Sequence, residues 1–157
     1  MRAARREDVP AIIAVHERGW RISYAGIADA DAKFARPAGE WAALWEEVLE
    51  DTRVVVADGV VAGFVLTGPS RDGDAPPRTA EILALYVDPD LQGRGHGRAL
   101  AEAVLSELAA AGYERVTLWT FARNPASRAF YERLGFASDG AMRSDADGDV
   151  VRYERAL

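Results

Sequence analysis

The feature that most constrains the fold of this chain is a glycine-rich run between a strand and a helix. The apolar segment 81–87 has the composition of a buried strand, and the alanine- and leucine-rich segment after Gly97 has that of a helix. Between them stands Gln92-Gly93-Arg94-Gly95-His96-Gly97. Glycine lets bare backbone approach a ligand closely, and the first N–H groups of a helix have no partner within it. Strand, glycine turn and helix start together predict a cradle for a pyrophosphate group.

Three kinds of glycine-rich cradle can be compared with this run. A nucleotide P-loop requires Lys-Ser or Lys-Thr after its glycines, and neither pair follows here. A dinucleotide loop requires a third glycine where this chain has Arg98. The pattern [QR]-x-x-G-x-[GA] fits without a mismatch, at Gln92, Gly95 and Gly97.

In this loop and in two further segments, the chain resembles the GNAT superfamily of N-acetyltransferases. The segment Glu81–Pro89 is similar to the central strand of that family, and Asn124–Phe136 is similar to its second signature. The order and separation of the segments also match, although the N-terminal third matches only loosely. The resemblance implies that acetyl-coenzyme A binds in the loop. A turn that merely lets a helix pack on a sheet is the alternative explanation of the glycines.

Bulk properties favour one globular domain over residues 1–157. The chain has no cysteine, which excludes disulfides, thiolate metal sites and a cysteine nucleophile. No apolar run is long enough for a membrane span, and the N-terminus lacks the apolar run of a signal peptide. We therefore expect a cytoplasmic protein without a membrane partner. The net charge of −6 argues against a nucleic-acid partner and suits a cationic amine substrate.

Turn residues and hydrophobic periodicity divide the chain into alternating elements. Strands are expected at residues 2–5, 53–57, 60–67, 79–87, 115–121, 136–142 and 150–154. Helices are expected after Asp8, over 41–49, 97–111 and 125–134. The resemblance implies that they build a mixed α/β (α+β) GNAT-like fold. It has a twisted, mostly antiparallel sheet of about six or seven strands, flanked by about four helices.

Transfer of an acetyl group from a thioester to an amine requires a base, because an ammonium ion has no lone pair. Keeping a lysine-like amine deprotonated at pH 7 costs about 4–5 kcal/mol. Glu81 lies on the strand that leads into the glycine loop. The resemblance places a general base there, and partial desolvation would bring a carboxylate toward the working pH range. A structural salt bridge is an equally weighted alternative for Glu81.

The second signature supplies the other expected catalytic group. By resemblance, Tyr131 meets the cofactor sulfur as general acid, and Asn124 contacts the pantetheine arm. The alternative for Tyr131 is a core position beside Phe130 and Phe136. Either assignment is compatible with its place in a helix.

The remaining cofactor contacts are expected from the strand end and the loop. Leu85, Tyr86 and Val87 offer backbone groups by resemblance, with the Val87 N–H polarising the thioester carbonyl. The loop contributes Gln92, Gly93, Arg94, Gly95, His96, Gly97 and Arg98. Either arginine could pair with a phosphate or be a solvated helix residue. His96 occupies a free position of the pattern.

The leading hypothesis is an acetyl-CoA-dependent N-acetyltransferase that acts on a small-molecule primary amine. The resemblance implies that the segment Trp20–Ile27 lines the acceptor site, with Trp20 and Tyr24 as the candidate substrate residues, and its aromatic content suits a compact pocket. The alternatives are an enzyme for protein or peptide amines, a non-catalytic acyl-CoA-binding module, and a tRNA-directed acetylating toxin, which the acidic charge disfavours. A homodimer is left open. No metal is expected, because a calcium loop that began at Asp145 would need a glycine at its sixth position and a glutamate at its twelfth, where this chain has Val150 and Ala156. The segment Asp145–Asp149 therefore reads as a hairpin tip. His16 is expected in the core.

Overall fold

Seven strands form one sheet in the computed structural model, which describes residues 1–145 and 147–157. Their order is β1-β2-β3-β4-β5-β7-β6, and only the β4–β5 pair is parallel. The strands are β1 (Arg2–Ala3), β2 (Thr52–Ala57), β3 (Val60–Pro69), β4 (Thr79–Val87), β5 (Arg115–Phe121), β6 (Ala137–Asp145) and β7 (Gly148–Ala156). The expected mixed, mostly antiparallel sheet is therefore confirmed.

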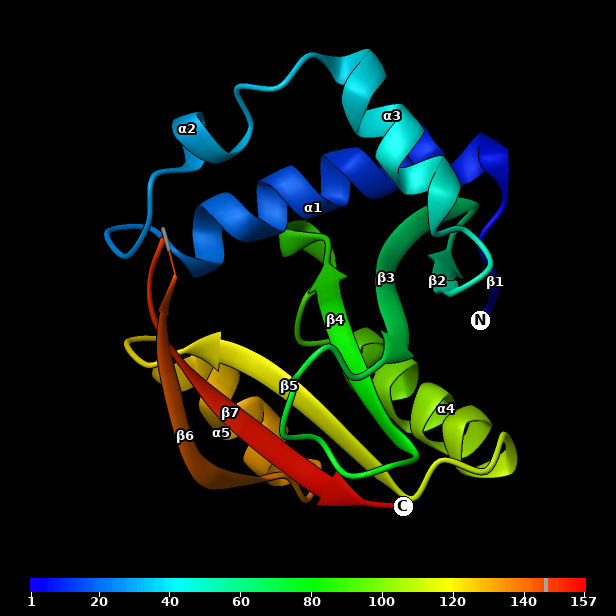
Figure 1. The fold of residues 1–157 in the computed structure, drawn as a ribbon. Coiled ribbons are helices and arrows are strands. Elements are labelled where there is room, and N and C mark those ends of the chain that lie inside the picture. The colour runs from blue at the N-terminus through cyan, green and yellow to red at the C-terminus, as the bar shows by residue number, and fades with distance from the viewer. Residues whose placement is uncertain (146) are drawn as a thin grey trace.

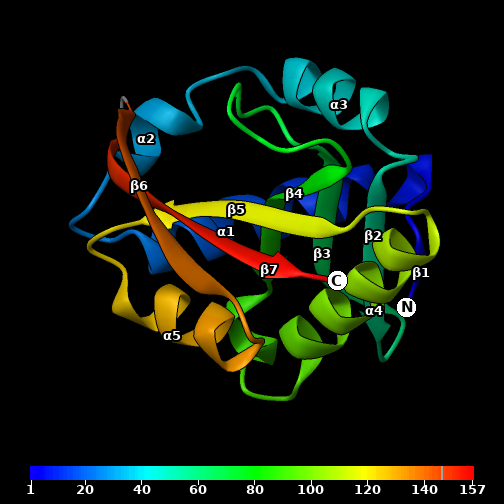
Figure 2. The same ribbon diagram turned by 60° about the horizontal axis from the view of Figure 1, so that its bottom comes forward.

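The helices cover both faces of this sheet. Those of the described residues are α1 (Val9–Ser23), α2 (Ala30–Lys33), α3 (Ala38–Glu47), α4 (His96–Ala110) and α5 (Pro125–Arg133), with 3-10 turns at Arg6–Asp8 and Pro89–Leu91. Figures 1 and 2 show α1 and α3 on one side of the sheet and α4 and α5 on the other. No helix of the described residues is both long and apolar enough to cross a bilayer.

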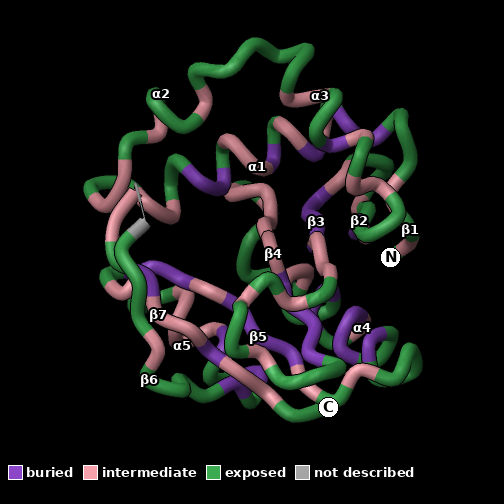
Figure 3. Tube along the Cα trace, viewed as in Figure 1, coloured by how far each residue is buried: buried purple, intermediate pink, exposed green. Residues whose placement is uncertain are grey.

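Two apolar cores result, one on each face. The larger joins α4 and α5 to the strands, with Leu100, Leu118 and Tyr153 almost fully buried. The smaller joins α1 and α3 to β2 and β3 around Ile12 and Phe64. Figure 3 shows buried residues concentrated on the strands and the inward faces of α1 and α4, while the connection from α2 to α3 is largely exposed.

Local sequence explains most element boundaries. Asp58 and Gly59 both have positive φ, 50° and 81°, as the tight turn between β2 and β3 requires. Gly112, with φ of 88°, follows the end of α4. The helix expected over 97–111 spans His96–Ala110, and Ala111 after it is exposed. The closing hairpin is longer than expected, and part of its anticipated tip, Ala146, lies outside the described residues.

A β-bulge in β4 determines which side chains face which core. Thr67 of β3 lies opposite Ile82 and Leu66 lies opposite Ala84, so Leu83 is the extra residue. Side chains alternate between the faces of a strand, and an inserted residue reverses that alternation. Ile82 therefore packs in the larger core, while Tyr86, four residues later, packs against the smaller one.

Candidate functional site

The central feature of the site is the separation of β4 from β5. The two strands pair only from Thr79 to Ile82, opposite Arg115 to Leu118. Beyond this point they point apart, as the two arrows in Figure 1 show. The gap opens into a cavity of about 820 Å³, called here the larger cavity. It is bounded by the end of β4, the glycine loop, the start of α4, the end of β5 and α5.

The backbone of the β4 end faces this cavity. Asp88 N–H donates to the Ala62 carbonyl at 2.8 Å, so its backbone points toward β3. Alternate residues of an antiparallel strand point to the same neighbour. The backbone groups of Val87 and Leu85 therefore point away from β3, into the space that β5 has left. Of these backbone groups, the Val87 carbonyl accepts a hydrogen bond from Gln92 Nε2 at 3.3 Å.

The glycine loop presents an open helix N-terminus to the same cavity. Gly93 and Gly95 have φ of 75° and 86°, in the left-handed region that favours glycine. Gly95 is the N-cap of α4, and no side chain caps the helix there. Ala99 N–H makes the first helical bond, to the Gly95 carbonyl. The N–H groups before it have no partner in the helix, so the loop fits a phosphate or pyrophosphate group.

The charged and polar loop residues take different positions. Gln92, His96 and Arg98 line the larger cavity, whereas Arg94 does not. Arg98 already pairs with Glu102 at 2.7 Å. Arg94 is exposed and makes no ion pair within the part of the chain that the structure describes.

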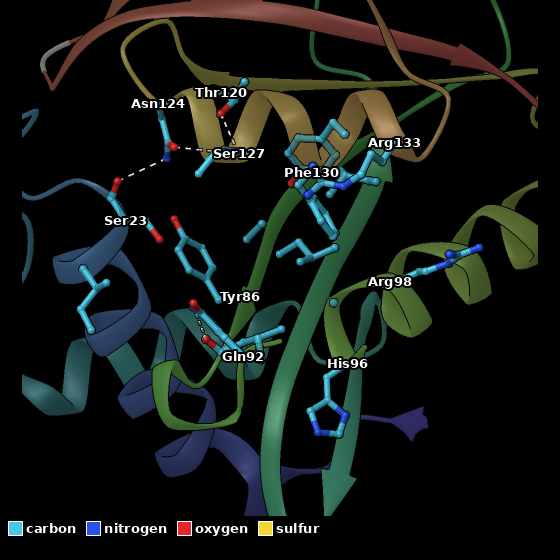
Figure 4. Close-up of a pocket in the computed structure, with 18 of the residues that line it drawn as sticks. Ser23, Tyr86, Gln92, His96, Arg98, Thr120, Asn124, Ser127, Phe130 and Arg133 are labelled. Atoms are coloured by element: carbon cyan, nitrogen blue, oxygen red, sulfur yellow. Dashed lines mark hydrogen bonds between the residues drawn. The ribbon is translucent and has the colours of Figure 1, made fainter. Parts of the chain in front are cut away.

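The opposite wall is built by the start of α5 (Figure 4). Asn124 is buried and caps α5, since its Oδ1 accepts from Ser127 N–H at 3.0 Å. Its Nδ2 donates to the Ser23 carbonyl of α1 at 3.2 Å. Thr120 at the end of β5 donates to the Ser127 hydroxyl at 2.9 Å. Asn124 thus lines the cavity while its polar atoms join α5 to α1.

Tyr131 lines the larger cavity from α5 and is 8% exposed. Its ring contacts Phe130 and Phe136 edge to face, at centroid distances of 5.1 and 5.8 Å. Burial, with a smaller contribution from Tyr24, raises the pKa of Tyr131 above its usual value. The phenol therefore stays protonated throughout the neutral pH range. It lies in the core, as one reading of the sequence expected, and also at the cavity wall.

Glu81 lies outside the larger cavity, on the paired part of β4, and is only 2% exposed. Its carboxylate accepts from the backbone N–H of Arg71 at 3.1 Å and from Arg71 Nε and Nη2 at 3.3 and 3.0 Å. The Arg71 side chain comes from the β3–β4 loop and is 67% exposed. The structural salt bridge that the sequence left open is thus present. The pair also borders a second cavity.

This second cavity, called here the smaller cavity, measures about 260 Å³. Lys33 of α2 and Asp147, both in its lining, form an ion pair at 3.4 Å, so α2 and the closing hairpin meet there. Six residues line both cavities: Tyr24, Ile82, Leu83, Tyr86, Trp119 and Thr120. The two spaces therefore adjoin where β4 and β5 part.

The predicted acceptor residues lie near this junction. Tyr24 lines both cavities, and burial raises its pKa. Trp20 is 3% exposed, lines neither cavity and packs edge to face on Tyr24 at 5.1 Å. Tyr86 was expected to act through its backbone, yet it lines both cavities, and its side chain is among those drawn around the pocket in Figure 4.

Several lining residues could not be identified from local sequence. Lys33, Arg71 and Arg143 line the smaller cavity from three distant segments. Trp119 and Thr120 occupy the end of β5, where their position is apparent only once the strands are known to separate. Phe130 also lines the larger cavity, and its position next to Tyr131 in the second signature is the one feature of the sequence that could have identified it. No group of three or more potential metal ligands occurs among the described residues.

Known acetyltransferases resemble this chain in sequence. A sequence model described as the acetyltransferase (GNAT) family matches residues 14–136. A mycothiol acetyltransferase from Saccharopolyspora erythraea is 31% identical over 132 residues, which cover 83% of this chain and 40% of that protein. Two others are matched over 20% and 25% of their length, so this chain spans less than half of these curated relatives.

Solved structures share the architecture over almost the whole chain. The PaiA N-acetyltransferase from Thermoplasma acidophilum, solved in complex with coenzyme A, is 21% identical with a TM-score of 0.75, covering 99% of this chain and 97% of that one. The ribosomal-protein-S18-alanine N-acetyltransferase from Escherichia coli is 26% identical with a TM-score of 0.67, covering 99% and 91%. The overall fold of this chain is thus shared with these two proteins.

Proposed function

Because this chain belongs to the GNAT acetyltransferase family, we propose that it transfers an acetyl group from acetyl-CoA to the primary amine of a small molecule. The observation that carries this proposal is the separation of β4 from β5 after Ile82. It brings the Val87 backbone, the uncapped start of α4 and Tyr131 to one cavity. A phosphorylated, thioester-bearing donor requires these three kinds of group together.

Acetyl-CoA is the donor, and the larger cavity is its proposed site. The N–H groups at the start of α4 would hold the pyrophosphate, with Arg94 or Arg98 supplying charge. Leu85 and Val87 would hydrogen-bond the pantetheine arm, and the Val87 N–H would polarise the thioester carbonyl. Asn124 lines the same wall, but its amide is engaged in capping α5. Its contribution is therefore to fix the wall against Ser23.

The reaction needs two proton movements. The acceptor ammonium first gives one proton to a base, and its nitrogen then forms a bond to the acetyl carbonyl carbon. The carbon–sulfur bond breaks, sulfur takes up a proton so that coenzyme A leaves as a thiol, and the second proton of the nitrogen replaces the one that the acid has given to sulfur. We assign the first proton to Glu81, directly or through water, and the protonation of sulfur to Tyr131. Glu81 acts within its pair with Arg71, whose exposed side chain can move aside.

A small acceptor is favoured over a polypeptide by the smaller cavity. Its volume is about 260 Å³, and the Lys33–Asp147 ion pair joins α2 to the closing hairpin at its wall. A polypeptide acceptor would need an open groove for the residues beyond its terminal amine. The names of the compared proteins cover both kinds of acceptor, since mycothiol is a small molecule and S18 is a ribosomal protein.

Product analysis tests the proposal. The protein is incubated with acetyl-CoA, a panel of small amines and a panel of peptides, and products are identified by mass spectrometry while released thiol is measured. We expect acetylated small amines and a stoichiometric amount of thiol. Binding of acetyl-CoA with neither product nor thiol would favour a non-catalytic acyl-CoA-binding module. Preferential acetylation of peptide N-termini would favour a protein acetyltransferase.

A further inference from the structure

The smaller cavity differs in charge from the chain as a whole. The chain carries a net charge of −6. Three cations nevertheless line this cavity, against two carboxylates, Glu81 and Asp147. The cations come from three separate elements: Lys33 from α2, Arg71 from the β3–β4 loop and Arg143 from β6. Asp72, outside the lining, also lies 3.7 Å from Arg143, so the case for an anionic ligand group depends on how these cations are arranged and not on net charge.

Arg71 has capacity for a second anion. Its Nε and Nη2 donate to Glu81, whereas its Nη1 donates to no residue in the part of the chain that the structure describes. The side chain is 67% exposed, although its carboxylate partner is almost fully buried. A guanidinium group carries five N–H donors in a plane, so it can hold two carboxylates at different edges. One edge is fixed to Glu81 and another faces solvent.

Arg143 and Lys33 are arranged around the same space. The guanidinium of Arg143 lies 4.2 Å from the ring centroid of Trp119, which lines both cavities. Its Nη1 is 3.7 Å from Asp72, so it is held in place by an aromatic face and a carboxylate. Lys33 reaches Asp147 at 3.4 Å, with its side chain 38% exposed. Both cations therefore keep solvent-facing surface.

We propose that the acceptor is a small primary amine that carries an anionic group, a carboxylate or a phosphate, a few bonds from its nitrogen. This inference rests on the proposed acetyl transfer. The anionic group binds between Arg71 and Lys33 or Arg143, while the amine points toward Glu81 and the junction with the larger cavity. The volume of about 260 Å³ equals roughly eight or nine waters, which suits a molecule the size of an amino acid.

The test compares matched pairs of acceptors that differ only in the anionic group. Kinetics with acetyl-CoA are measured for L-amino acids and their carboxamides, and for O-phosphoethanolamine and ethanolamine. We expect kcat/KM to be about tenfold or more higher for the anionic member of at least one pair, the scale of a charge-assisted hydrogen bond. The two pairs separate carboxylate from phosphate recognition. A carboxamide lowers the pKa of the neighbouring amine, so the neutral member of the amino-acid pair has the larger unprotonated fraction at neutral pH. A preference for the anionic member therefore does not arise from easier deprotonation of its amine.

Variants assign the preference to the smaller cavity. Arg71→Gln should bring the ratio of kcat/KM values for the anionic and neutral acceptors toward one, and so should Lys33→Gln or Arg143→Gln, whichever removes the second cation. The ratio is informative because a general loss of activity, including any effect of Arg71→Gln on Glu81, divides out of it. Arg36→Gln is the matched control: Arg36 lies close to Lys33 in sequence, pairs with Glu40 and lines neither cavity. It should leave the ratio unchanged.

The possible outcomes distinguish a failure of the anionic acceptor from a failure of the proposed acetyl transfer. Acetylation of both members of each pair with equal kcat/KM would overturn the anionic acceptor while leaving the acetyl transfer intact. A preference that persists in Arg71→Gln, or in both Lys33→Gln and Arg143→Gln, would overturn the assignment to these cations. Acetyl-CoA binding without acetylation of any amine would overturn the proposed function, and this inference with it.

Discussion

Among single residues, Tyr131 shows how packing and chemistry can coincide. Its ring lies between Phe130 and Phe136, and its burial keeps the phenol protonated at neutral pH. In the proposed mechanism the phenol is thus in the protonated form that a general acid requires. A residue in such a position can be tested without disturbing the core, because phenylalanine has the same ring.

We predict that Tyr131→Phe lowers kcat by about 10²- to 10⁴-fold, the usual contribution of a general acid, while the Kd of acetyl-CoA stays unchanged. Steady-state kinetics and calorimetry measure the two quantities. Tyr113→Phe is the matched control, because Tyr113 packs against the same core but lines neither cavity. Full activity in Tyr131→Phe would leave this tyrosine with a packing role alone.

For Glu81 the question is whether a carboxylate that is buried and paired with Arg71 serves as a base or only stabilises the fold. If Glu81 is the base, Glu81→Gln should lose most of its activity at neutral pH and less at high pH, where the acceptor is already deprotonated. Positioning and the Val87 N–H would still operate there. The measurement is kcat/KM against pH for wild type and variant, with thermal melts beside it.

The control for Glu81 is Glu154→Gln, which breaks another glutamate–arginine pair, with Arg115, away from both cavities. It should reduce stability without changing the pH profile. Parallel profiles for wild type and Glu81→Gln would assign Glu81 to structure, as the carboxylate that anchors the Arg71 loop.

His16 should make stability depend on mild acid. It lies among the rings of Phe34, Trp41, Trp45, Phe64 and Tyr86, and its Nδ1 has no hydrogen-bond partner in the structure described. Burial, followed by the charge of Lys33, lowers its pKa from 6.5 to about 4. The unfolded chain therefore takes up a proton before the folded chain does. This stabilising contribution is complete above pH 6.5 and is lost as pH falls toward 4.

The expected loss is on the order of 3 kcal/mol in the free energy of unfolding, from about 2.5 pKa units at 1.36 kcal/mol each. Urea melts between pH 7 and 4.5 measure it. His16→Leu keeps an apolar side chain and should flatten this part of the curve. Asp8 does not affect this pH range. Its hydrogen bond with Arg2 lowers its pKa, so its contribution to the free energy of unfolding is lost only below about pH 4. An unchanged slope in His16→Leu would contradict the assignment.

Among the elements, α4 has a glycine at each end, and substitutions at these two positions distinguish the effect of backbone strain from an effect on ligand binding. Gly95 and Gly112 stand at opposite ends of α4, have φ of 86° and 88°, and would each place a Cβ in open space. Alanine at either position should cost about 1–2 kcal/mol of stability, because the left-handed region disfavours a Cβ. Only Gly95 belongs to the loop that faces the larger cavity.

We therefore predict that Gly95→Ala weakens acetyl-CoA binding by about tenfold or more, the scale of one lost hydrogen bond to a charged group. Gly112→Ala should lower the melting temperature similarly and bind normally. Calorimetry with both variants decides. Equal affinities would mean that the loop is only a packing turn.

Elements with a local signal were predictable from the sequence. Asp58-Gly59 identified a hairpin, and Gly112 and Gly135 marked helix ends because φ near 85° is costly for other residues. The bulge at Leu83 had no such signal, since Ile82-Leu83-Ala84 reads as an uninterrupted apolar strand. Its effect is large nonetheless, because it turns Tyr86 toward α1. Strand separation likewise depends on pairing and leaves no local mark.

Across the whole molecule, the candidate site is assembled by contacts between distant segments. Asn124 reaches Ser23 across 101 residues, and Lys33 reaches Asp147 across 114. Resemblance located the glycine loop, Tyr131 and Glu81, because those lie in contiguous signatures. It could not locate Arg71 or Lys33, whose proposed role follows from where the β3–β4 loop and α2 lie in space. The resemblance therefore offers candidates for the donor side of the site but not these two cations of the acceptor side.

The adjoining cavities also lead to an expectation about the order of events in the proposed catalytic cycle. Donor and acceptor would occupy separate spaces that meet at Tyr86 and Trp119, so neither has to depart before the other arrives. The chain has no cysteine to carry the acyl group between visits. Initial rates measured at several fixed amine concentrations should thus give double-reciprocal lines that intersect, as for a ternary complex. Parallel lines would mean that an acylated residue survives after coenzyme A has gone, and that the junction between the cavities is crossed in two steps.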